Sequence, residues 1–409
     1  MNTASQTLRN ELAPATARRP AAVGVLLNLL DRLEGGRLNL TMPDGERVSL
    51  GHGGHGFEVH LREWSVFEQV LATGDIGFAE AYINGLWDTP ELARLLTLLA
   101  QNRGVIEAAL YGRWWSLLRH RLLHLLRSNT RAGSRRNIAA HYDLGNDFYR
   151  LWLDSGMTYS AALFDDEGAL GLEDAQAAKY RRILDRLGVK PGQQILEIGC
   201  GWGAFAELAA REYGARVRGV TLSARQLEFA RRRVAQAGTA ELATFELRDY
   251  RDVQGRFDHI VSIEMFEAVG ERFWPLFFRR LHQLLNPGGK ALIQTITIDE
   301  ALFERYRRGT DFIQRYIFPG GMLPSAQRFI ETARAAGLRV GDDFAFGADY
   351  ARTLALWHRR FVERTDELRD LGYDEVFQRT WRFYLAYCEA GFRAGSTDVR
   401  QFELVRGDA

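Results

Sequence analysis

The run from 195 to 203, ILEIGCGWG, constrains the fold of this chain more than any other segment. Its apolar start predicts a buried strand, and Gly199, Gly201 and Gly203 predict a tight turn that opens into a helix. Glycine reaches positive φ without strain and lets a ligand approach the backbone, while the next helix presents unpaired N–H groups at its start. The run therefore predicts that a nucleotide-like ligand binds where the strand ends.

Two details of this run narrow the choice of ligand. The third, spaced glycine of the dinucleotide fingerprint is missing, and Glu197 lies inside the strand just before the turn. A carboxylate there repels a pyrophosphate and attracts a cation. S-adenosylmethionine, which carries a sulfonium and an amino group, fits this site. A strand-to-helix turn that binds nothing is the alternative.

From about residue 137 onward, strand and helix patterns alternate. Strands are predicted at 194–198, 216–221, 244–247, 259–263 and 290–296, with helices between them. This alternation is typical of an α/β fold, a Rossmann-like parallel sheet with helices on both faces. Ligands of such sheets bind outside the carboxyl ends of the strands. We therefore expect site residues at 199–203, 221–226, 248–250, 264–267 and 294–296.

The first hundred residues follow a different pattern. After a polar segment, 1–20, which we expect to be a mobile tail, helical patterns at 23–33, 64–72 and 90–100 alternate with strand patterns at 36–41 and 57–61. They predict a smaller mixed α+β domain over 21–104. A chain of 409 residues, 46% hydrophobic, is long enough for two domains.

The segment 105–136 joins these parts. Between residues 101 and 136, eight arginines stand against a single acid, Glu107, and apolar residues including tryptophans recur at helical spacing. An anionic membrane surface attracts such a basic amphipathic helix, with about 1 kcal/mol for each cation near the headgroups. The alternative is a linker helix that packs between domains and solvates its basic face; the two interpretations are compatible.

The composition excludes several classes of function. With 53 basic and 52 acidic residues the net charge is +1, so we expect no nucleic-acid partner. The two cysteines, Cys200 and Cys388, predict neither a disulfide scaffold nor a metal site, and they favour the cytoplasm. We find neither a signal-peptide pattern nor a run of roughly 18 apolar residues, so we expect no insertion into a bilayer.

Seven motifs in order resemble the cyclopropane-fatty-acyl-phospholipid synthase and mycolic acid methyltransferase family. They are 141–149 (HYDLGNDFY), 157–160 (MTYS), 197–203 (EIGCGWG), 219–223 (GVTLS), 249–252 (DYRD), 265–270 (MFEAVG) and 315–321 (RYIFPGG). The resemblance spans about 137–409 and extends more loosely over 20–130. It implies a class I S-adenosylmethionine-dependent methyltransferase domain over 137–409, with an acyl-channel insertion at about 299–350. It also implies that the N-terminal domain assists membrane engagement and dimerisation.

The resemblance also assigns a cofactor pocket. Most methyltransferases place a carboxylate after the second strand to hold the ribose hydroxyls, whereas Thr221 and Gln226 must supply those hydrogen bonds here. Asp249 either faces the adenine edge or caps a helix. The residues assigned to the cofactor are Tyr142, Tyr159, Ser160, Glu197, Gly199, Gly201, Thr221, Leu222, Gln226 and Asp249.

The chemistry that the resemblance implies is methyl transfer to the cis double bond of an unsaturated acyl chain, through a carbocation that loses a proton to a base. In the family that base is bicarbonate, held by a Glu, a His, a Tyr and backbone groups. Glu267 and Tyr316 match the Glu and the Tyr, and Ile296 matches a backbone donor. Two positions depart from the pattern: Ala161 replaces a cysteine and Gln294 replaces the histidine.

Glu264 is a third departure, because relatives usually have a small residue there. Two neighbouring carboxylates do not readily both ionise, so either Glu264 or Glu267 should have a raised pKa suited to proton transfer. Our hypothesis is that this pair, with Gln294 and Tyr316, either binds the anion differently or replaces it as the base. The alternatives for Glu264 are a solvated loop acid and a ligand of the methionyl ammonium group.

The leading interpretation is an S-adenosylmethionine-dependent C-methyltransferase that forms cyclopropane rings in membrane phospholipids at the inner face of the membrane, with a homodimer allowed. A methyl- or methylene-branched product is the first alternative. A small-molecule N-methyltransferase and a catalytically silent lipid-binding protein are further alternatives. The double-bond position, the chain length and the identity of the base stay open at this point.

Overall fold

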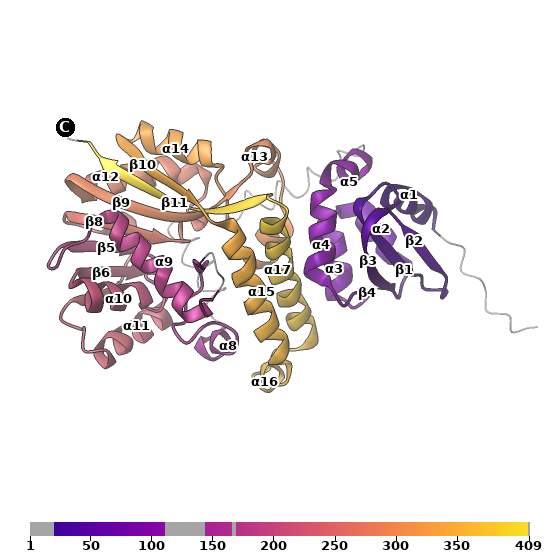
Figure 1. Cartoon of the computed structure of the whole chain (residues 1–409), viewed down its shortest axis with the longest axis horizontal. Helices are drawn as coiled ribbons and strands as arrows, with labels where there is room; N and C mark the ends of the chain where they lie inside the picture. Colours follow the sequence, from indigo (N-terminus) through magenta and orange to yellow (C-terminus); the bar gives the residue numbers. More distant parts are fainter. Residues whose placement is uncertain (1–19, 111–143, 166–168, 408–409) are drawn as a thin grey trace, which may run out of the picture.

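The computed structural model describes residues 20–110, 144–165 and 169–407. Its larger part is built on a seven-stranded sheet of order β10-β11-β9-β8-β5-β6-β7 (Figure 1). The five strands β5 to β9 run parallel, and β11 lies antiparallel between β9 and β10. Their bounds are β5 Gln194–Ile198, β6 Arg216–Thr221, β7 Ala243–Leu247, β8 Phe257–Ile263, β9 Leu285–Ile298, β10 Leu338–Ala345 and β11 Thr397–Arg406.

Helices cover both faces of this sheet because its strands are apolar on both sides. In β5, Ile195 joins the core with α9 (Leu172–Leu187), α10 (Ala204–Tyr213) and α11 (Ala224–Gln236). Leu196 and Ile198 belong to the opposite core with α12 (Trp274–Leu284) and α14 (Ala326–Ala335). This confirms the predicted Rossmann-like α/β fold and its five parallel strands. The two C-terminal strands, β10 and β11, were not predicted.

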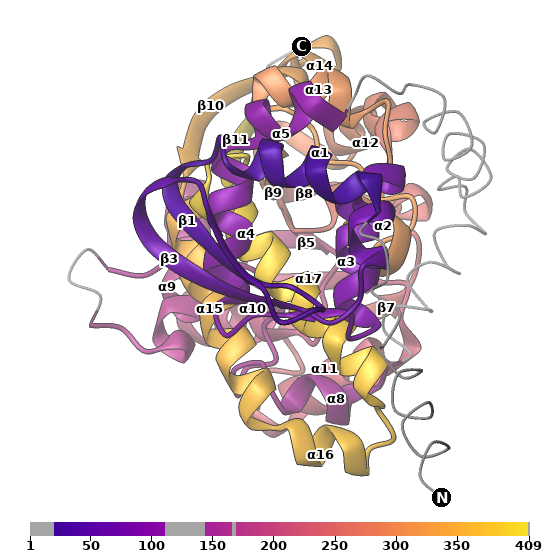
Figure 2. The same ribbon diagram turned by 90° about the vertical axis from the view of Figure 1, so that its right-hand side faces the viewer.

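The smaller, N-terminal part has a four-stranded sheet of order β2-β1-β3-β4, in which β1 and β3 are parallel (Figure 2). The strands are β1 Glu34–Thr41, β2 Arg47–Leu50, β3 His52–Leu61 and β4 Trp87–Asp88. The helices are α1 Ala21–Leu30, α2 Ser65–Thr73, α3 Asp75–Ile83, α4 Leu92–Gln101 and α5 Arg103–Leu110. Each helix and strand pattern predicted over 21–100 is present, and α3 is an additional helix.

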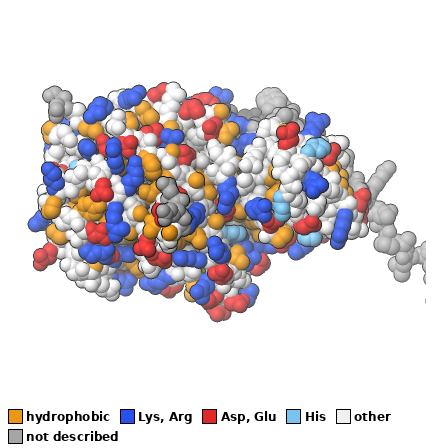
Figure 3. All heavy atoms as spheres, in the orientation of Figure 1, with side chains coloured by type: hydrophobic (Ala, Val, Ile, Leu, Met, Phe, Trp, Pro, Cys, Tyr) orange, Lys and Arg blue, Asp and Glu red, His pale blue; other side chains and the backbone are white. Residues whose placement is uncertain are grey.

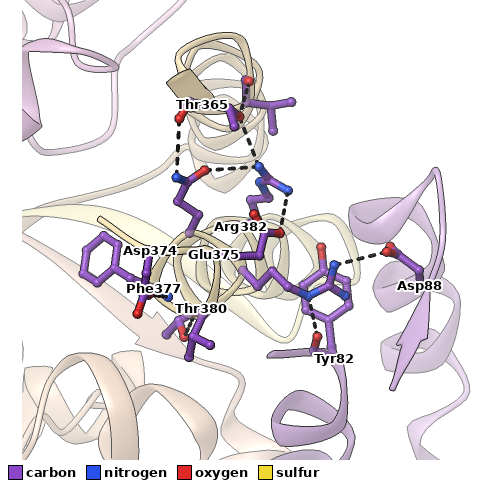
Figure 4. A network of polar contacts seen from close by, with 12 residues as sticks. Tyr82, Asp88, Thr365, Asp374, Glu375, Phe377, Thr380 and Arg382 are labelled. Atoms are coloured by element: carbon purple, nitrogen blue, oxygen red, sulfur yellow. Dashed lines mark hydrogen bonds and ion pairs between the residues drawn. The ribbon is translucent and has the colours of Figure 1, made fainter. Parts of the chain in front are cut away.

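Helix α17 (Glu375–Arg393) lies between the two parts, packed against α15 (Gly347–Glu363) on one side and against α3 and α4 on the other (Figure 1). Arg379 of α17 is 7% exposed and joins the parts directly. Its guanidinium donates to the carbonyls of Tyr82 (2.6 Å) and Trp87 (3.0 Å) and to the Asp88 carboxylate (3.1 Å). Figure 4 shows Tyr82 and Asp88 approaching α17 from the N-terminal part. The N-terminal part is therefore anchored on the helix that also borders the site described below.

Further elements complete the larger part: α8 (Asn146–Arg150), α13 (Glu300–Tyr306), a π-helical turn η5 (Ile313–Ile317) and α16 (Thr365–Asp370). None of the helices within the described ranges is long and apolar enough to cross a membrane. Acidic and basic side chains are interspersed over the face shown in Figure 3. The predicted tail and residues 111–136 of the predicted basic helix lie outside the described residues.

Candidate active site

A cavity of about 690 Å³ begins at the carboxyl ends of β5, β6 and β8 and reaches into the N-terminal part. The turn after β5 forms one wall. Gly199 (φ +84°) and Gly201 (φ +50°) adopt the left-handed conformation that the sequence predicts. A Cβ atom on Gly199 would lie 3.0 Å from Met265, so the turn also needs a glycine for space. At Gly199 and Gly201 the turn therefore brings backbone without side chains to the cavity.

Glu197 lies beneath this turn and lines the cavity. It is buried, and its Oε2 atom has no hydrogen-bond partner among the described residues. Burial raises the pKa of this carboxyl group well above its usual range. A buried carboxylate oxygen without a partner is costly unless a ligand satisfies it. The amino group of S-adenosylmethionine is a ligand of the right charge.

The segment after β6 supplies neutral polar groups. Thr221, Leu222 and Gln226 all line the cavity, and the Thr221 hydroxyl donates to the Gln226 side-chain oxygen (2.9 Å). Asp249, in contrast, does not line it. Its carboxylate accepts from the backbone N–H of Arg251 (2.9 Å) and forms an ion pair with the Arg251 guanidinium (2.5 Å). The structure thus supports helix capping for Asp249, and its contact with adenine stays a prediction.

Two of the predicted entry residues reach the cavity, Tyr159 and Ser160. The Tyr159 hydroxyl hydrogen-bonds the Tyr384 hydroxyl of α17 (2.6 Å). Tyr142, the third predicted entry residue, lies outside the described residues.

Lys179 of α9, which no sequence motif identifies, contacts the entry segment from the side opposite the cavity. It is 0% exposed, and its ammonium group donates to the Ser160 hydroxyl and to Gln176 (2.7 Å). Burial lowers the pKa of Lys179 to about 7, although the carboxylates of Glu264 and Asp154 act in the opposite direction. The sequence signal that could have identified Lys179 is its position four residues after the apolar Ala175. This spacing places both residues on the same face of α9, the buried one.

Glu264 sits immediately after β8 in a conformation that non-glycine residues rarely adopt, with φ +50°. One carboxylate oxygen accepts from the backbone N–H of Ala161 (2.8 Å) and from the Gln294 amide (2.8 Å). The other accepts from the Tyr350 hydroxyl (2.6 Å). Three donors from distant segments therefore converge on one buried carboxylate. Such strain persists where the surrounding structure enforces it, and it concentrates at functional sites.

The orientation of Gln294 is fixed by its neighbours. Its side-chain oxygen accepts from Gln401 of β11 (3.0 Å), and the Gln401 oxygen in turn accepts from Arg182 of α9. This chain directs the NH₂ group of Gln294 at Glu264, as the hydrogen-bond pattern requires. Burial raises the pKa of Glu264, and the hydrogen bond from Tyr350 and the charge of Lys179 partly offset that shift.

Glu267 lines the same end of the cavity. Its Oε1 atom accepts from the backbone N–H of Ile296 (2.6 Å), whereas Oε2 is buried without a hydrogen-bond partner among the described residues. Burial and the neighbouring Glu264 carboxylate raise the pKa of Glu267 to about 8. The two carboxyl groups therefore occupy different environments, as expected for a buried pair.

Tyr316 does not reach this site. Its side chain is 39% exposed, and its hydroxyl donates to Glu80 of α3 at the contact with the N-terminal part. The assignment of Tyr316 to the base site was wrong because η5 turns that side chain outward. Tyr350, at the start of α15, contacts Glu264 instead. Its sequence signal was weak, because a tyrosine in an amphipathic helix is usually explained by packing.

The rest of the cavity is largely apolar. Residues 302–318 of the predicted insertion contribute Leu302, Tyr306, Ile313 and Phe318, and α17 contributes Phe383, Tyr384 and Tyr387. Aliphatic and aromatic side chains suit a hydrocarbon ligand. The aromatic faces can also stabilise a transient positive charge. The site thus joins the glycine turn above Glu197, a buried carboxylate pair and an apolar slot.

The fold and this donor site define the class of the protein, an S-adenosylmethionine-dependent methyltransferase. The model of the mycolic acid cyclopropane synthetase family matches residues 129–402. The chain belongs to that family, which includes cyclopropane-fatty-acyl-phospholipid synthases, and it is an enzyme.

Relatives agree with this membership. The chain is 46% identical to tuberculostearic acid methyltransferase of Mycobacterium tuberculosis over 81% of this chain and 79% of that protein. It is 35% identical to cyclopropane-fatty-acyl-phospholipid synthase of Escherichia coli over 86% of this chain and 88% of that protein. The structure of mycolic acid cyclopropane synthase CmaA1 complexed with SAH and CTAB matches with a TM-score of 0.63 and 35% identity, over 66% of this chain and 98% of that one.

Proposed function

We propose that this enzyme methylates the cis double bond of an unsaturated acyl chain in a membrane phospholipid, with Glu264 as the proton acceptor. The observation that carries the proposal is the set of donors on Glu264. Ala161 and Gln294 occupy positions that the family uses to hold bicarbonate, and here both donate to the Glu264 carboxylate. The protein's own carboxylate thus takes the place of the external anion.

S-adenosylmethionine supplies the methyl group and leaves as S-adenosylhomocysteine. Glu197 and the 199–203 turn would hold its charged end, and Thr221 and Gln226 its ribose. Once the methyl carbon has bonded to one alkene carbon, the other alkene carbon is cationic. Glu264 then accepts a proton from the new methyl group, and the freed electron pair closes a cyclopropane ring. A fixed carboxylate in an apolar slot is suited to that step because it is shielded from water.

A methylene-branched product is the second candidate. Here a hydride moves between the two former alkene carbons before the same methyl group loses its proton, leaving an exocyclic double bond. The 46% identical relative supports keeping this candidate, because it is named a tuberculostearic acid methyltransferase and not a cyclopropane synthase. The same residues serve both products, so the lifetime of the cation decides between them.

The test is incubation with labelled S-adenosylmethionine and vesicles of dioleoyl phosphatidylglycerol, followed by assignment of the product by NMR and fragmentation mass spectrometry. We expect lipid methylation that continues at full rate after bicarbonate is removed. Strict dependence on added bicarbonate would exclude Glu264 as the base. Absence of any methylated lipid would exclude the function.

We further propose that the enzyme acts from the cytoplasm at the membrane surface. The apolar slot supports this, since a phospholipid chain must leave the bilayer to enter it. Co-sedimentation with anionic vesicles at low and at high salt tests the association, and binding that salt weakens is the expected result.

A further inference from the structure

The cavity does not end at the apolar slot. It continues into the interior of the N-terminal part, between α1, α2 and α4 and the four-stranded sheet. We call this portion the N-terminal lobe. It is lined by the apolar residues Leu26, Leu29, Leu30, Leu38, Leu40, Val59, Leu61, Val66, Phe67, Val70, Leu95, Leu96 and Leu99. An apolar space inside a small domain, continuous with an active site, is suited to hydrocarbon.

A polar cluster stands where the lobe meets the catalytic part. It consists of Asp75 and Arg103 from the N-terminal part and of Arg305, Thr310 and Asp311 from the 300–318 segment, and all five line the cavity. The Tyr387 hydroxyl of α17 hydrogen-bonds Asp75 (3.2 Å) across the junction. The Thr310 hydroxyl oxygen is buried without a hydrogen-bond partner among the described residues.

Two arginines of this cluster, Arg103 and Arg305, line the cavity where the two parts meet. Burial raises the pKa of Asp75, and it raises the pKa of Asp311 to about 7, so both acids hold protons more readily than usual. Burial and the positive charge of Arg103 lower the pKa of Arg305, whereas the charge of Asp75 raises it, so these three side chains lie close enough to interact. Two neighbouring arginines from different domains form a typical contact for a phosphate group.

Resting on the proposed function, we infer that the N-terminal lobe binds the second acyl chain of a diacyl phospholipid, while the Arg103–Arg305 cluster holds its phosphate and glycerol region. A single hydrocarbon chain that ran from the slot into the lobe would press methylenes against this cluster, which is unfavourable. A lipid with a polar centre and two diverging chains places each portion against matching groups. The enzyme then selects diacyl phospholipids over acyl substrates with one chain.

The first experiment compares two substrates in mixed micelles, dioleoyl phosphatidylglycerol and 1-oleoyl lysophosphatidylglycerol. Leu95→Trp fills the lobe, and Leu92→Trp is the matched control, because Leu92 is buried in the same helix but does not line the cavity. We expect Leu95→Trp to lower kcat/KM for the diacyl lipid about tenfold or more, because every methylene denied burial weakens binding severalfold. The lysolipid rate should stay within about twofold, and Leu92→Trp should keep the wild-type ratio.

Equal losses on both substrates, or no loss on either, would overturn the inference. If the wild-type enzyme methylates neither lipid, the proposed function fails instead, so the two failures are distinguishable. A second measurement does not depend on the folding of a variant. A phosphatidylglycerol with one oleoyl chain and one saturated chain that ends in a diazirine is photolysed with the wild-type enzyme. Adducts within residues 26–106 are expected, and adducts confined to α13 and α17 would refute the assignment.

Discussion

The buried carboxylates at the two ends of the catalytic cavity differ in how many hydrogen bonds they accept. At the donor end, Glu197 keeps an oxygen without a partner among the described residues. At the acceptor end, Glu264 receives three hydrogen bonds, from Ala161, Gln294 and Tyr350. A buried carboxyl oxygen without a partner suits a ligand that donates a hydrogen bond, whereas a fully coordinated carboxylate leaves no donors for a second anion. Under the proposed function, the enzyme binds its methyl donor at the first end and uses its own Glu264 carboxylate as the base at the second.

The largest expected effect tests the acceptor end. Glu264→Gln keeps the shape of the side chain but removes the proton acceptor. Methyl transfer to dioleoyl phosphatidylglycerol should fall about 10²- to 10⁴-fold, the usual contribution of a general base. Affinity for S-adenosylhomocysteine, measured by calorimetry, should stay at the wild-type value.

Added bicarbonate should not restore the Glu264→Gln variant, because the carboxamide still fills the anion position. Glu331→Gln, on the exposed surface of α14, is the control for the substitution itself. Wild-type turnover in Glu264→Gln would remove the contrast between the two ends.

The second prediction tests the donor end. Glu197→Gln replaces a carboxylate by a neutral amide, so the charge-assisted hydrogen bond to the ligand's amino group is lost. Such bonds are worth about 1.5–3 kcal/mol, so the Kd for S-adenosylhomocysteine should rise about tenfold to a hundredfold. Calorimetry measures this directly. An unchanged Kd would show that Glu197 is a structural acid.

The third prediction compares Tyr350 with Tyr316, and its expected effect on turnover is smaller. Tyr350→Phe removes one donor from Glu264, so the pKa of Glu264 rises further and less of it is ionised at neutral pH. We expect turnover near pH 7 to fall about tenfold, as for the loss of a hydrogen bond to a charged group, and the rising limb of the pH profile to move to higher pH.

Tyr316→Phe is the matched control, since that hydroxyl bonds Glu80 at the domain contact. Its turnover and its pH profile should match those of the wild-type enzyme. A reversed order, with Tyr316→Phe impaired and Tyr350→Phe intact, would restore the sequence-based assignment.

The smallest effect is on stability. The pKa of Glu267 is raised to about 8, so between the ordinary carboxyl pKa and pH 8 the unfolded state releases this proton while the folded state retains it. Glu267 therefore lowers the free energy of unfolding as the pH rises through that range. Glu267→Gln should raise Tm by a few degrees at pH 8 and by less at pH 5. Equal shifts at both pH values would show that the residue does not titrate in this way.

The local sequence was sufficient to predict structural features that a single continuous segment forms. The Gly199–Gly203 turn was predictable because glycine spacing and strand pattern act within nine residues. The strands β5 to β9 were predictable because their apolar runs need no partner to be recognised. By contrast, β10 and β11 follow the catalytic motifs at the C-terminal end, where an antiparallel edge and a helix give similar short apolar patterns.

The residues that contact Glu264 at the acceptor end could be identified only from the tertiary structure. The sequence identified Glu264 and Gln294 as unusual, since each is a residue type out of place in a motif, and it identified Glu267 as a match to the family's Glu. It did not identify which tyrosine faces them, because Tyr316 and Tyr350 lie on separate elements whose orientation depends on packing. The burial of Lys179 also depends on the packing of its helix against the rest of the protein.

What the sequence determined by itself is the five parallel strands of the sheet, the donor turn and the identity of the two acids, because these depend on neighbours along the chain. What the tertiary structure decided is the coordination of Glu264 and the extension of the cavity into the N-terminal part. Both depend on contacts between segments that lie 30 or more residues apart in the sequence, and hydrogen-bond geometry at that range is set by tertiary packing rather than by local pattern.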